Sequence, residues 1–219
     1  MKWFLKKTYP DYWEDYVASF KNPQEHNLRQ IRFVVFDTET TGLNPKTDVI
    51  LSIGCVAISN LCITVADQFE CYLEQSHFNP DTVKIHGLLQ KGHLHKTDEV
   101  TAIIKFLNFI KNAVLIAHHA AFDVAMINCA LKRQGLPKLK NTVIDTIQVF
   151  KKSSSYNRHT QLNLDALAER YNIPLHDRHT AAGDAYITAL LFLKLVAELG
   201  TDKDIILKDL IKSPRIGLL

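Results

Sequence analysis

The feature that most constrains the fold of this chain is a short apolar run that ends in two acids. The run from Ile31 to Phe36 is almost entirely apolar, as expected of a central strand covered on both faces. Asp37 and Glu39 follow it, and residues i and i+2 of a strand point to the same face. Two like charges held together cost free energy unless a cation or a proton neutralises them. The segment therefore predicts a buried strand that carries a candidate site for a hard metal ion.

Two further acids stand at the predicted starts of helices. The apolar residues after position 121 recur at helical spacing, which puts Asp123 in the first turn of a helix. Thr180 is a suitable N-cap for the apolar stretch 185–199, which puts Asp184 in the first turn of the last long helix. His179 then lies just outside this helix, and from a loop it can reach the same point as Asp184.

The order of the remaining elements predicts an α/β fold. Three strands followed by alternating helices and strands favour a mixed sheet flanked by helices. We also expect a short aromatic helix over residues 11–20, packed against the back of the domain. The expected strands are 31–37, 49–58, 62–73, 113–117 and 142–146, and the expected helices are 100–111, 122–134, 164–171 and 181–199.

Composition narrows the class of protein. A length of 219 residues with 47% hydrophobic content suits one domain with a substantial core. The net charge of +3 is only mildly basic, so it is weak evidence for nucleic-acid binding. The sequence has neither an apolar run of membrane-spanning length nor the apolar core of a signal peptide. We therefore expect a cytoplasmic protein without membrane contact, in which the four cysteines are buried free thiols.

Three motifs occur in a fixed order along the chain. They are Phe-Asp-Thr-Glu-Thr-Thr-Gly-Leu at 36–43, Ala-His-His-Ala-Ala-Phe-Asp at 117–123 and His-Thr-Ala-Ala-Gly-Asp at 179–184. In this order and at these spacings they resemble the DEDDh branch of the DEDD 3′→5′ exonucleases, close to the proofreading epsilon subunit of bacterial DNA polymerase III and its stand-alone relatives. The resemblance covers about residues 32–199. One departure is His119, where the family usually has Asn.

The resemblance implies a ribonuclease H-like fold with a five-stranded mixed sheet flanked by helices. It divides the chain into an N-terminal aromatic helix and linker at 1–30, an exonuclease domain at 31–200 and a short C-terminal tail at 201–219. The tyrosine branch of the superfamily places an aromatic residue where this chain has Thr180, so the histidine branch is the one expected.

The resemblance also implies the site residues. Two Mg²⁺ or Mn²⁺ ions are expected between the four acids, with His179 as the base that takes a proton from the attacking water. The segment after the first two acids is expected to hold the 3′-terminal nucleotide, and Phe122 is either a stacking platform or a core aromatic. The predicted catalytic residues are His179, Asp37, Glu39, Asp123 and Asp184, of which the four acids are the metal ligands. The predicted substrate-binding residues are Thr38, Thr40, Thr41, Gly42, Leu43, His86, His119 and Phe122.

The function predicted in this way is a metal-dependent 3′→5′ exonuclease. It would hydrolyse phosphodiester bonds from the 3′ end of single-stranded or frayed DNA and release nucleoside 5′-monophosphates, with a polymerase or a repair protein as partner. One alternative is an RNA-trimming exonuclease or oligoribonuclease, which uses the same five residues. Another is a non-catalytic nucleic-acid-binding module, whose signature would be the loss of a metal acid or of His179. The short tail favours a stand-alone or repair-type enzyme.

Overall fold

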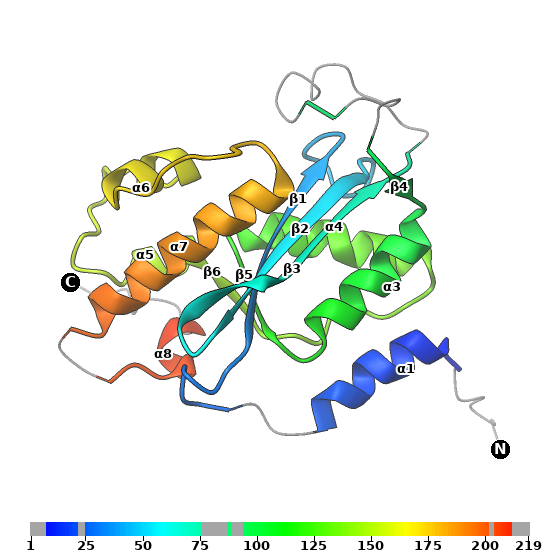
Figure 1. Ribbon diagram of the computed structural model, residues 1–219, viewed down its shortest axis with the longest axis horizontal. Coiled ribbons are helices and arrows are strands. Elements are labelled where there is room, and N and C mark those ends of the chain that lie inside the picture. The colour runs from blue at the N-terminus through cyan, green and yellow to red at the C-terminus, as the bar shows by residue number, and fades with distance from the viewer. Residues whose placement is uncertain (1–7, 22–24, 76–86, 89–93, 202–203, 212–219) are drawn as a thin grey trace.

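A mixed sheet forms the centre of the molecule. The computed structural model describes residues 8–21, 25–75, 87–88, 94–201 and 204–211. In these residues the chain forms one six-stranded sheet with the order β4-β3-β2-β1-β5-β6 (Figure 1). Strand β1 runs antiparallel to β2 and parallel to β5. The strands are β1 (Phe33–Thr40), β2 (Ile50–Ser59), β3 (Cys62–Leu73), β4 (Lys96–Thr97), β5 (Val114–Ala117) and β6 (Val143–Asp145).

The predicted α/β architecture is confirmed, with one strand more than the five expected. The additional strand in the described part of the chain is β4, which pairs with the end of β3. It is two residues long, and such a segment carries no periodicity by which a sequence could reveal it. The short helix α5 (Thr146–Phe150) is also absent from the sequence prediction, because five residues show no helical repeat.

Helices cover both faces of the sheet (Figure 1). Helices α3 (Glu99–Ile110) and α4 (Ala120–Arg133) pack on one face, and α7 (Ala181–Leu199) crosses the other, beside α6 (Leu164–Arg170). Side chains of β1 alternate between these layers. Val34 and Phe36 belong to the core under α3 and α4, whereas Phe33 and Val35 belong to the core under α7. The end of β1 thus presents alternate residues to two helical layers.

The aromatic helix lies against the domain. Helix α1 (Asp11–Ala18) continues into the 3₁₀ turn η1 (Ser19–Lys21), and it buries Trp13 and Tyr16 in the core on the α3 side. The hydroxyl of Tyr16 donates to Oδ1 of Asn141 at 2.6 Å and accepts from the amide of Lys140 at 2.8 Å. Burial raises the pKa of Tyr16 to about 12. The helix is therefore anchored by both apolar and polar contacts.

The linker after η1 meets the segment that leads into the last short helix. Asn27 forms an antiparallel bridge with Ile206, directly before the short helix α8 (Leu207–Ile211). Nζ of Lys152 donates to the carbonyl oxygens of Asp209 and Leu210, both at 2.8 Å, and so caps the end of α8. The division of the chain at residues 30 and 200 stays a prediction.

The cysteines are free, and their burial differs from the expectation. Cys55 and Cys71 are buried, and burial raises the pKa of both thiols. Cys62 is exposed and Cys129 is only half-buried, so the prediction of buried thiols is wrong at these two residues. Cys62 is the first residue of β3, next to the hairpin turn. Among the described helices none is long and apolar enough to cross a membrane.

Candidate active site

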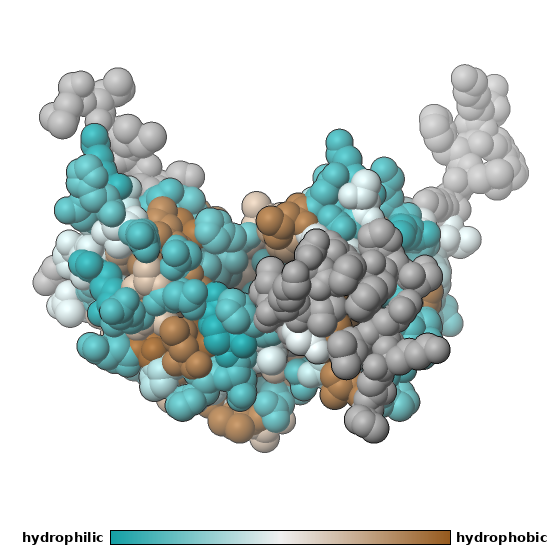
Figure 2. All heavy atoms as spheres, turned by 90° about the horizontal axis from the view of Figure 1, so that it is seen from above, coloured by the Kyte–Doolittle hydropathy of each residue, from teal (hydrophilic) through white to brown (hydrophobic). Residues whose placement is uncertain are grey.

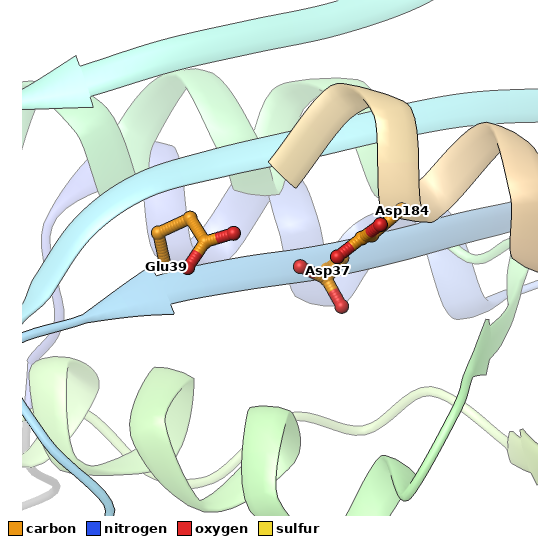
Figure 3. Close-up of side chains that lie close together, drawn as sticks. All are labelled: Asp37, Glu39 and Asp184. Atoms are coloured by element: carbon orange, nitrogen blue, oxygen red, sulfur yellow. The ribbon is translucent and has the colours of Figure 1, made fainter. Parts of the chain in front are cut away.

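Three carboxylates meet beside the carboxyl end of β1. Asp37 and Glu39 project from the α7 face of β1, and Asp184 comes from the first turn of α7 (Figure 3). One ligand oxygen from each of the three lies within 4.8 Å of the other two. All these ligands are carboxylate oxygens, the donors that Mg²⁺, Mn²⁺ and Ca²⁺ prefer.

A glycine on β2 allows this approach. Gly54 pairs with Asp37 across the β1–β2 ladder. A Cβ atom on Gly54 would lie 2.2 Å from the carbonyl carbon of Ala181, the first residue of α7. Only glycine leaves enough room for the helix start to lie directly on the sheet. Thr180 caps the helix as predicted, because its Oγ1 accepts from the amide of Gly183 at 3.1 Å. The cap and the close contact together aim Asp184 at Asp37.

Arg178 bridges two acids at the edge of this cluster. Its Nη1 donates to Oδ2 of Asp184, and its Nε donates to Oδ1 of Asp165 at 2.6 Å. The side chain of Asp184 is only 8% exposed, so this ion pair is largely desolvated. Sequence reasoning missed Arg178. The signal that could have found it is a basic residue directly before His179, in a segment expected to adjoin four acids.

The other oxygen of Asp184 lacks a partner. Oδ1 is buried and accepts no hydrogen bond from the residues that the structure describes. A buried acceptor without a donor costs free energy, and a cation bound to it would remove that cost. The buried unpaired oxygen and the all-oxygen donor set both fit a divalent metal ion.

Burial and, after it, the neighbouring charges raise the pKa values of these acids. The pKa of Asp37 lies well above its usual range, first because of burial and then because of the neighbouring charges of Asp123 and Asp184. Burial and the charge of Asp184 raise the pKa of Glu39 to about 7. Burial also raises the pKa of Asp184, and the charge of Arg178 opposes the increase at all three acids. Without a metal ion, the cluster therefore retains protons up to near-neutral pH.

Asp123 reaches the end of β1 from the opposite face. It is buried, and its Oδ1 accepts from both the amide and the hydroxyl of Thr38, at 3.0 and 2.6 Å. Thr38 alternates with Asp37 and Glu39 along β1, so it faces α4. Burial raises the pKa of Asp123 to about 7, and the bonds from Thr38 oppose that shift.

The structure thus brings three of the four predicted metal acids together and places the fourth beside them. The oxygens of Asp123 lie outside the group that meets within 4.8 Å. Its bonds to Thr38, which is next to Asp37 in the strand, nevertheless hold it nearby, and its charge contributes to the raised pKa of Asp37. Asp123 is therefore close to the cluster, on the side that Thr38 occupies.

His179 lies just outside α7, where the sequence predicts it. Its backbone has a left-handed φ of 66°, and its side chain is exposed. Its Nδ1 lies 3.4 Å from Nη1 of Arg178. The turn before α7 therefore presents an exposed imidazole at the rim of the acid cluster.

The segment that follows Glu39 forms a closed loop with one protruding apolar side chain. Thr40 and Thr41 are buried, and Oγ1 of Thr41 donates to Oδ1 of Asp48 at 3.0 Å. A Cβ on Gly42 would lie 2.6 Å from Oδ2 of Asp48, so the close approach at this glycine is to that carboxylate. Leu43 is 85% exposed. Asp48, which closes the loop, was not among the predicted site residues.

The remaining predicted substrate contacts are scattered. His119 is exposed at the start of α4 with a φ of 60°, and this left-handed region favours Asn and also admits His. Phe122 is half-buried and packs against the α3–α4 core. His86 lies outside the described residues. The surface at the end of the molecule toward which β1 runs is mostly hydrophilic, with hydrophobic side chains in small separate patches (Figure 2).

Comparison with known proteins shows the family. The exonuclease family RNase_T matches residues 34–192, and the chain belongs to this family. The predicted resemblance to the DEDD exonucleases is thereby confirmed.

Curated relatives of the chain are polymerases. A DNA polymerase III PolC-type of Listeria innocua serovar 6a is 31% identical over 201 residues, which cover 90% of this chain and 13% of the relative. A second, from Caldanaerobacter subterraneus subsp. tengcongensis, is 37% identical over 169 residues, which cover 76% of this chain and 12% of the relative. The chain thus spans a small fraction of the length of these relatives.

Solved structures share the fold. E. coli exonuclease I in complex with a dT13 oligonucleotide superposes with a TM-score of 0.67 at 15% identity, covering 77% of this chain and 42% of that one. Exonuclease X in complex with 5′ overhanging duplex DNA gives a TM-score of 0.58 at 21% identity, covering 76% of this chain and 91% of that one. These likenesses support the ribonuclease H-like fold.

Proposed function

We propose that this chain is a metal-dependent 3′→5′ exonuclease. It removes nucleoside 5′-monophosphates from the 3′ end of single-stranded or frayed DNA. The observation that carries the proposal is that carboxylate oxygens of Asp37, Glu39 and Asp184 meet, in a chain of an exonuclease family. Oδ1 of Asp184 is buried and has no hydrogen-bond partner among the described residues, which supports a cation there.

The choice of DNA rests on the relatives. The matching segments of the curated relatives are parts of DNA polymerase III PolC-type chains. Two of the structurally similar exonucleases were solved with a single-stranded oligonucleotide and with an overhanging duplex. We propose the same kind of end as the substrate here, and a polymerase or a repair protein as the partner.

Each group at the site has a proposed role. Asp37, Glu39 and Asp184 would hold Mg²⁺ or Mn²⁺, and Asp123 would complete the set for two ions. When bound, such ions neutralise charge on the scissile phosphate and activate a water molecule. His179 accepts the proton of the attacking water through its exposed ring. The exposed Leu43 contacts the terminal base. The loop that Asp48 closes through Thr41 holds Leu43 in position.

A labelled-strand assay tests the proposal. Single-stranded DNA and RNA of one sequence, each labelled at the 5′ end, are incubated with the wild type and with Asp184→Asn, in Mg²⁺ or in chelator. We expect a ladder of progressively shortened DNA and free 5′-monophosphates, only for the wild type and only with Mg²⁺. RNA should be cut more slowly than DNA.

Three outcomes count against the proposal. Equal rates on strands with a 3′-hydroxyl and a 3′-phosphate, or cutting of a closed circular strand, would exclude recognition of a 3′ end. Faster hydrolysis of the RNA strand would instead favour an RNA-trimming enzyme.

A further inference from the structure

Arg178 occupies an unusual position for a basic side chain. Its guanidinium contacts Asp184, one of the three clustered acids, through Nη1. Its Nε contacts Asp165 on α6, whose side chain is 51% exposed and lies outside the cluster. One arginine thus joins a candidate metal ligand to an acid with no other role at the site.

The charge of Arg178 is permanent at any pH that a protein tolerates. It compensates part of the negative charge of the cluster as long as metal is absent. A divalent ion that binds Asp184 must approach this guanidinium, and two cations close together repel one another. A divalent ion can therefore bind Asp184 fully only when the guanidinium of Arg178 moves away from this carboxylate.

The contact to Asp165 gives Arg178 an alternative position. The Nε bond to Asp165 involves none of the clustered acids, so Nη1 can leave Asp184 while the side chain stays attached at the rim. Oδ1 of Asp184, which has no hydrogen-bond partner in the described part of the chain, offers an incoming ion its first contact. The geometry therefore allows exchange of one cation for the other without unfolding of the turn before α7.

We propose that Arg178 is a built-in counter-ion, which competes with the divalent metal ion at Asp184 and so sets the metal concentration at which the site is occupied. This inference rests on the proposed function, because it presumes a metal ion at the cluster. In this role Arg178 stabilises the metal-free cluster and raises the metal concentration that is needed to fill the site.

Titration of the purified full chain with Mn²⁺ by calorimetry tests this, together with thermal melting in chelator. The variants are Arg178→Gln, which removes the charge, and Arg178→Lys, which keeps it. Arg133→Gln is the matched control, because Arg133 pairs with Glu99 between α4 and α3 at 2.6 Å, on the surface.

We expect Arg178→Gln to bind Mn²⁺ about tenfold more tightly, since a unit charge beside a ligand is removed. It should melt below the wild type in chelator. Arg178→Lys and Arg133→Gln should bind Mn²⁺ as the wild type does.

The possible results separate the inference from the proposed function. Weaker Mn²⁺ binding by both Arg178 variants would show that Arg178 orients Asp184, and it would overturn the proposal that Arg178 is a counter-ion. Equal Mn²⁺ affinity for the wild type and Arg178→Gln would also overturn it, and the proposed function would stand. A wild type that binds no Mn²⁺ would overturn the proposed function itself and the inference with it.

Discussion

The two faces of β1 at its carboxyl end hold their acids in different ways. On the α4 face, Asp123 is buried and accepts two hydrogen bonds from Thr38, which are neutral donors of the chain itself. On the α7 face, Asp37, Glu39 and Asp184 face one another. There one buried oxygen has no partner among the described residues, and the compensating charge comes from Arg178.

The difference follows from the alternation of a single strand. Thr38 points to one helical layer and its neighbours Asp37 and Glu39 point to the other. Hydrogen bonds from neutral groups can satisfy one carboxylate, but three carboxylates in contact need positive charge or protons. We therefore expect the α7 face to respond to metal ions more strongly than the α4 face.

The largest expected effect is the loss of an acid on the α7 face. Asp184→Asn should lower hydrolysis of a single-stranded DNA oligomer to background, because it removes a charged ligand of the proposed metal site. Asp67→Asn is the control, since Asp67 pairs with Arg32 directly before β1 and lies away from the cluster. A wild-type rate of hydrolysis for Asp184→Asn in Mg²⁺ would show that the α7 face of β1 takes no part in the reaction.

A smaller loss is expected at the rim of the same face. His179→Ala should lower turnover by roughly 10²–10⁴-fold, which is the usual contribution of a general base. Mn²⁺ binding measured by calorimetry should remain, because His179 is assigned no bond to metal. His176→Ala is the matched control, as another exposed histidine in the same turn. Loss of Mn²⁺ binding in His179→Ala would contradict the assignment.

On the α4 face, loss of the Thr38 hydroxyl should lower turnover less than loss of an acid does on the α7 face. Thr38→Val removes the hydroxyl that donates to Asp123, and we expect turnover to fall by about 10–100-fold, as for other groups that orient a ligand. Thr188→Val is the control, since its buried hydroxyl has no partner in the described chain. Unchanged turnover in Thr38→Val would mean that the orientation of Asp123 does not matter.

The smallest expected effect is on stability as a function of pH. The pKa values of Glu39 and Asp123 are both raised to about 7, mainly by burial, whereas carboxyl groups of the unfolded chain titrate near pH 4. Between about pH 4 and pH 7 the folded protein therefore binds more protons than the unfolded one, so stability falls as the pH rises through this range. In chelator the Tm should be several degrees lower at pH 7.5 than at pH 5, given about 2–4 °C for each kcal/mol in a chain of this size.

Thermal melting in chelator and in Mg²⁺ checks this dependence. Saturating Mg²⁺ should restore the Tm at pH 7.5, because a ligand of the folded state adds stability. Asp123→Asn removes one titrating group and should flatten the pH dependence in chelator. A Tm that rises from pH 5 to pH 7.5 in chelator would show that the acids are not crowded.

Much of the fold could be predicted from the sequence, since its long elements are strongly periodic. The alternation in β1 and the cap at Thr180 placed Asp37, Glu39 and Asp184 correctly at a strand end and a helix start. Strand β4 could not be predicted, because a pairing of two residues depends on tertiary contacts.

The site was predicted less completely than the fold. Residue types and spacing identify acids, but they do not show which face of β1 each one approaches. The engagement of Asp123 by Thr38 depends on where α4 crosses the strand. The roles of Arg178 and Asp48 depend on loops that fold back on the site, and no periodic pattern marks such contacts.

Anomalous diffraction from crystals grown with Mn²⁺ tests the central claim most directly, namely that the α7 face of β1 is a metal site. We predict an anomalous difference peak within coordination distance of Asp37 and of Oδ1 of Asp184, with Nη1 of Arg178 moved away from Oδ2. An anomalous map without a peak beside these two acids, at millimolar Mn²⁺ and neutral pH, would contradict the account.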